Sequence, residues 1–193
     1  SGYYRDQTFM LALNEISVQQ IFSALYANTD IKKEPMSGGR QMGSHFMSNY
    51  IDEKGDFIDS TQKYNSSADI SPTSGQMPRL LGLAMASKLY REGSFNSKNF
   101  SNNGNEVAWG TIGNASTSEG PFFEVFNAAG VHQVPMIISV WDDEYGISVD
   151  NSYQTTKSSI SKALHGFKRD KLNKGFEIYT VDGWDYQSLI QIY

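Results

Sequence analysis

The chain has 193 residues, a net charge of −5 and no cysteine. The length suits one well-packed domain, and an acidic balance without a basic run argues against nucleic acid and anionic membrane surfaces as partners. The lack of cysteine excludes disulfides and thiolate chemistry, and no apolar run in the sequence approaches the roughly 20 residues of a membrane-spanning helix. We expect a soluble, cytoplasmic protein.

The first half of the sequence predicts helices separated by a long irregular segment. Apolar residues recur at helical spacing over residues 9–25, and Ser17 with Gln20 has the register of a capping box at the start of a second helix. Residues 28–70 show no sustained period, and a loop of this length in a compact domain is either functional or disordered. Helical period resumes over residues 76–91.

From Glu106 onward, strand and helix patterns alternate. The expected elements are a strand at 107–111, a small-residue turn at 113–116, a helix from about residue 119, a strand at 136–141, a helix at 155–167 and a strand at 176–181. Such alternation predicts an α/β fold with a doubly wound parallel sheet flanked by helices. Because no internal repeat or linker divides the sequence, we expect residues 1–193 to form a single domain.

Asn114 and Asp143 each follow one of the predicted strands. Consecutive parallel strands with a right-handed crossover have their carboxyl ends at the same sheet edge, so both side chains should face one crevice. A predicted helix N-terminus opens into the same crevice and favours phosphate oxygens. The alternative is that residues 142–144, which read Asp-Asp-Glu, are only a solvated acidic turn, as most short acidic runs are.

The same region resembles the motif of thiamine-diphosphate enzymes, in which Gly-Asp-Gly or Gly-Asp-Ala precedes a short helix, a strand and Asn-Asn. Here residues 113–115 read Gly-Asn-Ala and residues 142–143 read Asp-Asp. The resemblance implies that the side chains of Asn114 and Asp143 and the carbonyl of Tyr145 hold Mg²⁺ against the diphosphate. The family's Asp is Asn here and its Asn is Asp, so one carboxylate and one amide remain, a donor set that suits Mg²⁺.

Four further segments sharpen the resemblance. Residues 2–6 read Gly-Tyr-Tyr-Arg-Asp, residues 39–45 read Gly-Arg-Gln-Met-Gly-Ser-His, residues 71–78 read Ser-Pro-Thr-Ser-Gly-Gln-Met-Pro, and residues 181–185 read Val-Asp-Gly-Trp-Asp. In this order they resemble the alpha-type domain of the decarboxylating component of 2-oxo acid dehydrogenase complexes, as in branched-chain and pyruvate dehydrogenases. The resemblance covers almost the whole chain, and a fusion to a beta-type part stays open.

The resemblance implies an oxidoreductase that uses thiamine diphosphate and Mg²⁺. The cofactor's ylid attacks a 2-oxo acid and accepts electrons when CO₂ leaves, and the acyl unit passes to a lipoyl-bearing acyltransferase. The positions implied to bind the cofactor are Tyr4 and Arg5 at the terminal phosphate, Ser71 to Thr73 at the aminopyrimidine, the backbone amides of Gly113, Ala115 and Ser116 at the diphosphate, and Ile147 beside the central part.

The three histidines have different expected roles. His45 lies in the loop that carries Arg40 and is a candidate for catalysis, through substrate-carboxylate recognition or proton handling; the alternative is a loop histidine bonded to backbone. His132 should satisfy last-turn carbonyls of its helix, and His165 should pack or lie on the surface. Glu119 should favour the helix dipole rather than act as a general base.

The resemblance also implies partners. In this family a beta-type, pyrimidine-binding domain supplies the glutamate that activates the aminopyrimidine, and nothing in this sequence resembles that domain. We therefore expect a fragment of a longer enzyme that is oligomeric and catalytically silent when isolated. Two other classes stay open: an inert cofactor-binding module, because Asn114 replaces Asp, and an acetoin-cleaving or transketolase-like thiamine enzyme. The sequence does not indicate which 2-oxo acid is used.

Overall fold

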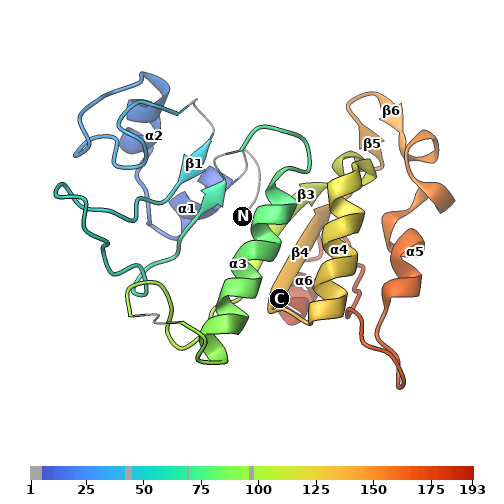
Figure 1. The fold of residues 1–193 in the computed structure, drawn as a ribbon. Coiled ribbons are helices and arrows are strands. Elements are labelled where there is room, and N and C mark those ends of the chain that lie inside the picture. Colours follow the sequence, from blue (N-terminus) through green and yellow to red (C-terminus); the bar gives the residue numbers. More distant parts are fainter. Residues whose placement is uncertain (1–5, 42–44, 69, 96–97) are drawn as a thin grey trace. The chain divides into compact units, whose positions relative to one another are not determined.

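The computed structural model describes residues 6–41, 45–68, 70–95 and 98–193 (Figure 1). The chain forms two compact units. The first runs to Ile112 and includes Val134–Trp141, and the second consists of Gly113–Gln133 and Asp142–Tyr193. No helix in the described ranges is long and apolar enough to cross a membrane.

Two short helices open the first unit, α1 (Asp6–Ala12) and α2 (Val18–Leu25). The predicted capping box is confirmed: Ser17 Oγ accepts the backbone N–H of Gln20 at 3.2 Å, and the Gln20 side chain accepts the backbone N–H of Ser17 at 2.8 Å. The helices and the following loop share one apolar cluster. Its buried members are Met10, Ile16, Met36 and Phe46, with Leu11, Ile21 and Ala24 packed against them.

A buried carboxylate organises the long loop that follows α2. Glu34 is fully buried, and its oxygens accept the backbone N–H groups of Met36 at 2.9 Å and Gly39 at 2.7 Å. They also accept the backbone N–H of Ser37 at 3.0 Å and its hydroxyl at 2.7 Å. Gly39 has a φ of 74°, and a Cβ there would lie 2.5 Å from the carbonyl oxygen of Ala27, so this position requires glycine. The described part of this loop therefore has a defined structure.

The same loop contains a short antiparallel pair, β1 (Phe46–Met47) with β2 (Ser67–Ala68). Beyond β1, the backbone N–H of Ser48 donates to the carbonyl of Ser66 at 2.9 Å, and the Ser48 hydroxyl accepts the Ser66 N–H at 2.9 Å. Both serines are buried. The pairing brings the segment around His45 beside the segment that follows β2.

A small parallel sheet of β3 (Ala108–Gly113) and β4 (Met136–Trp141) is packed beside α3 (Gln76–Arg91) (Figure 1). The predicted helix over 76–91 and strand over 136–141 are confirmed, and β3 begins one residue later than predicted and ends two residues later. The Gln76 side chain donates to the carbonyl of Thr111 at 3.2 Å and joins the helix to the sheet. The fully buried apolar residues of the helix are Met77, Leu80 and Ala84.

The second unit centres on α4 (Gly120–His132), which agrees with the helix predicted from about residue 119. Phe126 stacks on Phe176 with 4.0 Å between ring centroids, and it meets the ring of Phe167 edge-on at 5.2 Å. Aromatic pairs of this kind contribute about 0.5–1.5 kcal/mol each beyond their burial. The other buried apolar residues of this unit are Phe122, Val125, Ala129, Ile160 and Leu164.

Shorter elements complete the second unit. In chain order they are η1 (Ala115–Ser118), β5 (Tyr145–Gly146), β6 (Val149–Asp150), η2 (Asn151–Tyr153), η3 (Thr156–Ser158), α5 (Ile160–Ala163), η4 (Leu164–Phe167) and α6 (Tyr186–Ile192). β5 pairs antiparallel with β6, so the acidic segment after β4 leads into a tight hairpin.

Two predicted elements are wrong. Residues 176–181 form no strand; within this range only Phe176 forms a β-bridge, to Lys168, and its ring stacks on Phe126 of α4. The helix predicted at 155–167 is broken into η3, α5 and η4, since Lys157 has a φ of 61° and Ser159 is extended and caps α5. Helices and a small parallel sheet confirm a mixed α/β architecture, and the full doubly wound sheet is not shown in the described ranges.

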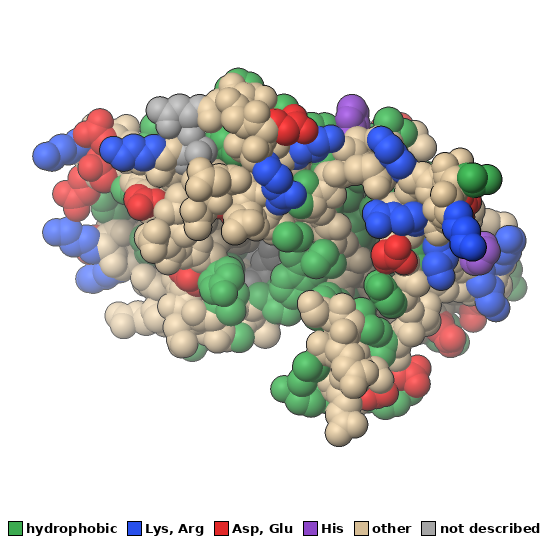
Figure 2. Space-filling view, turned by 90° about the horizontal axis from the view of Figure 1, so that it is seen from below, with side chains coloured by type: hydrophobic (Ala, Val, Ile, Leu, Met, Phe, Trp, Pro, Cys, Tyr) green, Lys and Arg blue, Asp and Glu red, His purple; other side chains and the backbone are tan. Residues whose placement is uncertain are grey.

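Charged side chains of both signs are mixed on the face drawn in Figure 2, with hydrophobic side chains exposed among them. Both units contribute large exposed hydrophobic residues. Examples are Phe22 and Leu25 on α2 of the first unit, and Trp184 and Tyr186 at the start of α6 in the second. Single exposed apolar side chains are common on soluble proteins and do not by themselves mark an interface.

Candidate functional site

Asn114 is the turn residue between β3 and η1, and it is 3% exposed. Its carbonyl accepts the backbone N–H of Thr117 at 3.1 Å and the Thr117 hydroxyl at 2.6 Å. These bonds start the helical turn of η1 directly after the strand. Gly113, Ala115 and Ser116, the residues predicted to approach a diphosphate, therefore surround a fixed, buried amide side chain.

Asn151, at the start of η2, connects Asn114 to the acidic turn. Asn114 Nδ2 donates to Asn151 Oδ1 at 3.4 Å, and Asn151 Nδ2 donates to Asp142 Oδ1 at 3.5 Å. The hydroxyl of Thr155 also donates to Asn151 Oδ1, at 3.3 Å. Asn114, Asn151 and Thr155 are buried, whereas Asp142, at the other end of this chain of polar contacts, is exposed.

The acidic turn is shaped by its own side chains. Asp142 Oδ1 accepts the backbone N–H of Glu144 at 3.0 Å, and Asp143 Oδ1 accepts that of Tyr145 at 3.2 Å. Glu144 has a φ of 67° and Ile147 a φ of 57°, both in the left-handed region. Asp143 is exposed and Ile147 fully so. The turn is thus both solvated, as the alternative interpretation requires, and held in one shape.

Gly146 fixes how closely the two halves of the motif approach. A Cβ on Gly146 would lie 2.6 Å from Cβ of Ala115, which is far below a normal contact. The β5–β6 hairpin and η1 therefore pack directly against each other within the second unit. The structure brings together the segments predicted to hold the diphosphate and the metal, although Asn114 meets the acidic turn through Asn151 and Asp142, not through Asp143.

The chemistry of these donors fits Mg²⁺. Asn114 Oδ1, the Asp143 carboxylate and the carbonyl of Tyr145 are all oxygens, and Mg²⁺ is commonly held by one or two carboxylates together with phosphate and water. No group of three or more His, Cys, Asp or Glu side chains suited to a metal lies in the described ranges. A metal here would therefore depend on amide, backbone and phosphate oxygens as well as on Asp143.

A second set of candidates meets in the first unit. His45 Nε2 and Ser71 Oγ form a hydrogen bond, although 26 positions separate them in the sequence. Ser71 and Thr73 are exposed, and His45 is partly buried. The histidine predicted to handle a proton therefore contacts the turn predicted to meet the aminopyrimidine. This hydrogen bond joins two side chains.

Other predicted positions are either outside the described residues or on the surface. Tyr4 and Arg5 are outside the described residues, as is the middle of the 39–45 motif. His132 and His165 are exposed, and the Gln133 side chain donates to the carbonyl of Gly130 in the last turn of α4 at 2.6 Å. None of these observations places another titratable group at the Asn114 turn.

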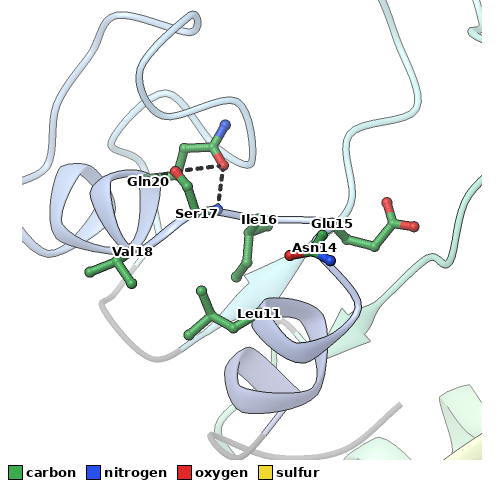
Figure 3. Close-up of a pocket in the computed structure, with 7 residues that line it drawn as sticks. All are labelled: Leu11, Asn14, Glu15, Ile16, Ser17, Val18 and Gln20. Carbon is green, nitrogen blue, oxygen red and sulfur yellow. Dashed lines mark hydrogen bonds between the residues drawn. The ribbon is translucent and has the colours of Figure 1, made fainter.

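A surface pocket of the first unit lies at the turn between α1 and α2 (Figure 3). Leu11 and Ile16 point toward each other in its apolar floor, while Gln20 turns back to Ser17. The carboxylate of Glu15 accepts the backbone N–H of Tyr64 at 2.9 Å and is therefore engaged with the long loop. The pocket contains none of the residues predicted to bind the cofactor.

Comparison with known proteins identifies the family. The model of the dehydrogenase E1 component matches residues 1–188, almost the whole chain. The chain belongs to the dehydrogenase E1 component family. The E1 chain is also 28% identical over 183 residues to the 2-oxoisovalerate dehydrogenase subunit alpha of Bacillus subtilis (strain 168), a match that covers 95% of this chain and 44% of that protein. It thus spans less than half the length of this relative, and the predicted family is confirmed.

The sequence motifs of the E1 chain did not reveal Asn151 and Thr155. Both are buried polar residues. Asn151 contacts Asn114 across 37 positions of sequence, and Thr155 contacts Asn151 across 4 positions. Neither belongs to a segment that resembles a family motif. Burial of an asparagine is visible only after folding, so nothing in the residue order predicted this contact.

Proposed function

We propose that this E1 chain is the diphosphate-binding part of a thiamine-diphosphate-dependent 2-oxo acid dehydrogenase. The observation that carries the proposal is the packing of the Asn114 turn against the acidic hairpin through Gly146. Family membership supports the cofactor class, because E1 components typically use thiamine diphosphate. In this proposal Asn114 Oδ1, the Asp143 carboxylate and the Tyr145 carbonyl bind Mg²⁺.

The chain's own groups position the phosphate end of the cofactor. Backbone N–H groups of Gly113, Ala115 and Ser116 donate to diphosphate oxygens at the start of a helical segment, where the local dipole favours negative charge. Tyr4 and Arg5 bind the terminal phosphate, a role that suits the planar fork of an arginine. Ile147, exposed on the hairpin, provides an apolar contact to the central part of the cofactor.

His45, Ser71 and Thr73 act at the aminopyrimidine and the substrate. The cofactor, when bound, supplies the carbon nucleophile and the electron sink for decarboxylation. His45 handles a proton at the reacting centre or binds the substrate carboxylate, and its hydrogen bond to Ser71 orients the imidazole for either task.

The substrate and partners belong to the same proposal. A branched-chain 2-oxo acid or pyruvate is the substrate, and the similarity to the 2-oxoisovalerate dehydrogenase subunit alpha of Bacillus subtilis favours the branched-chain class. A beta-type, pyrimidine-binding domain covers the cofactor, and the acyl unit passes to a lipoyl-bearing acyltransferase in an oligomeric complex.

A decarboxylation assay with an artificial electron acceptor tests this function. Pyruvate and branched-chain 2-oxo acids are supplied to this chain alone and after addition of a beta-type domain. We expect turnover only after mixing, since the chain alone leaves the reacting centre open to water. Turnover by the isolated chain at a rate typical of enzymes contradicts the proposed division of labour.

An inert cofactor-binding module is the second candidate, favoured by the buried amide of Asn114 in place of the family's carboxylate. It predicts saturable thiamine-diphosphate binding without turnover in any mixture. Turnover restored by Asn114→Asp would assign the loss to this one side chain. Formation of products from acetoin instead of 2-oxo acids would identify a different thiamine-dependent enzyme.

A further inference from the structure

Asn151 is held in place by its backbone on both sides. Its N–H donates to the carbonyl of Glu144 at 2.9 Å, and its carbonyl accepts the N–H groups of Gln154 at 3.1 Å and Thr155 at 2.8 Å. The preceding residue, Asp150, caps η2 by accepting the N–H of Ser152 at 2.8 Å. These backbone hydrogen bonds therefore fix the position of Asn151 relative to the acidic turn.

Both polar atoms of the Asn151 side chain form hydrogen bonds. Oδ1 accepts from Asn114 and from Thr155, and Nδ2 donates to Asp142. Since Nδ2 is committed to the acidic turn, Oδ1 is the atom left to face Asn114. An acceptor in that position selects one orientation of the Asn114 amide, with Nδ2 toward Asn151 and Oδ1 directed away from it.

The orientation of Asn114 matters because an amide has one oxygen. A carboxylate presents an equivalent oxygen whichever way it is turned, whereas a flipped asparagine would present NH₂, which cannot ligate Mg²⁺. Among the described residues, the side-chain hydrogen bond of Asn114 uses Nδ2 and leaves Oδ1 for another partner.

We propose that Asn151 is a positioning residue that orients the Asn114 amide so that Oδ1 is presented to a divalent cation. This inference rests on the proposed function, because it assigns a role toward the same metal. Asn151 touches neither metal nor substrate; it acts through Asn114. A merely structural Asn151 would stabilise the hairpin without regard to which side chain occupies position 114.

The test is a double-mutant cycle on the full-length protein. Mn²⁺ binding in the presence of thiamine diphosphate is followed by electron paramagnetic resonance for the wild type, Asn151→Ala, Asn114→Asp and the double variant. Loss of a residue that orients a metal ligand typically weakens metal affinity about 10–100-fold. We expect a loss in this range for Asn151→Ala in the wild-type background and a much smaller loss in the Asn114→Asp background, where either oxygen can ligate.

Two further variants keep the test decisive. Thr155→Val removes the other donor to Asn151 Oδ1 and should lower the melting temperature while Mn²⁺ affinity stays near that of the wild type. Asn151→Gln retains an amide that can accept from Asn114 and donate to Asp142, and it should retain Mn²⁺ affinity, which can be measured even if Asn151→Ala does not fold.

Equal losses of affinity for Asn151→Ala in both backgrounds would overturn the inference, as would a loss for Asn151→Gln as large as that for Asn151→Ala. These results leave wild-type Mn²⁺ binding intact, so the proposed function would survive them. If the wild type does not bind Mn²⁺ in the presence of thiamine diphosphate, the proposed function is contradicted, and the inference with it.

Discussion

Two acidic turns in this chain use their carboxylates in opposite ways. Glu34, in the first unit, is fully buried and accepts hydrogen bonds from Met36, Ser37 and Gly39 with both of its oxygens. Asp143, in the second unit, is exposed, and within the described part of the chain its Oδ1 accepts one hydrogen bond, from the N–H of Tyr145. The first carboxylate is saturated by its own loop, while the second keeps an oxygen for a ligand.

The difference shows how to distinguish a structural acid from a candidate ligand. A buried carboxylate with several intrachain donors stabilises the backbone around it, and its removal leaves those donors unsatisfied. Removal of an exposed carboxylate from a preformed turn changes the free energy of unfolding little, and such a carboxylate is free to change its hydrogen-bond partners. We therefore assign Glu34 to the fold, and the proposed binding role falls to Asp143.

The largest expected effect is on the structural side of this comparison. Glu34→Ala should lower the free energy of unfolding by about 3 kcal/mol or more, because buried N–H groups of Met36 and Gly39 lose their acceptor. Chemical denaturation followed by circular dichroism measures it. Asp52→Ala is the matched control, since Asp52 accepts N–H groups of Lys54 and Asp56 in an exposed turn and should cost less than about 1 kcal/mol. Equal losses would contradict the assignment of Glu34.

The next largest effect is on cofactor binding at the acidic turn. Asp143→Asn should weaken Mg²⁺-dependent binding of thiamine diphosphate by about tenfold or more, because it removes the charged ligand. It should change the free energy of unfolding by no more than about 0.5 kcal/mol, as expected of an exposed position. Asn114→Asp should weaken binding less, since it adds a carboxylate to the shell. Equal and negligible effects of both substitutions on calorimetric binding would place the metal elsewhere.

A smaller effect distinguishes the two turns by pH. Burial would raise the pKa of Glu34, but the hydrogen bonds from Gly39, Ser37 and Met36 outweigh burial and lower the pKa below its usual value. A carboxyl whose pKa is lowered by folding stabilises the protein above its unfolded pKa, about 4.3, and this contribution is lost as the pH falls through the folded pKa.

Glu34→Gln should therefore flatten the decline in the free energy of unfolding below about pH 5, relative to the wild type. Denaturation midpoints measured across that range test this. An unchanged acid slope in the variant would show that folding does not lower the pKa of Glu34, and its assignment as a charged acceptor stabilised by the loop's N–H groups would then be wrong.

Local patterns in the sequence predicted the elements that depend on local interactions. The helix over 76–91, the strand over 136–141 and the capping box at Ser17 have the predicted bounds, because helical period, β-branched residues and cap side chains act within a few positions. Motif resemblance likewise predicted that the Asn114 turn and the acidic turn would meet.

Contacts between distant residues account for what the sequence did not predict. The pattern at 176–181 suits a strand, yet Phe176 stacks on Phe126 of α4 and contributes its ring to a helix core. Asn151 reaches Asn114 across 37 positions, and no short-range signal marks it. Glu34 is buried because its loop folds around it. The sequence did not predict this, because charged residues are rarely buried unless they are paired.

Calorimetric titration of the wild-type protein with thiamine diphosphate, with Mg²⁺ and then with a chelator in excess, tests the central claim most directly. If Asn114, Asp143 and the Tyr145 carbonyl form the proposed Mg²⁺ shell, saturable binding appears with Mg²⁺ and is lost with the chelator. Saturable binding that is unchanged by the chelator, or no binding in either condition, would contradict the proposed shell.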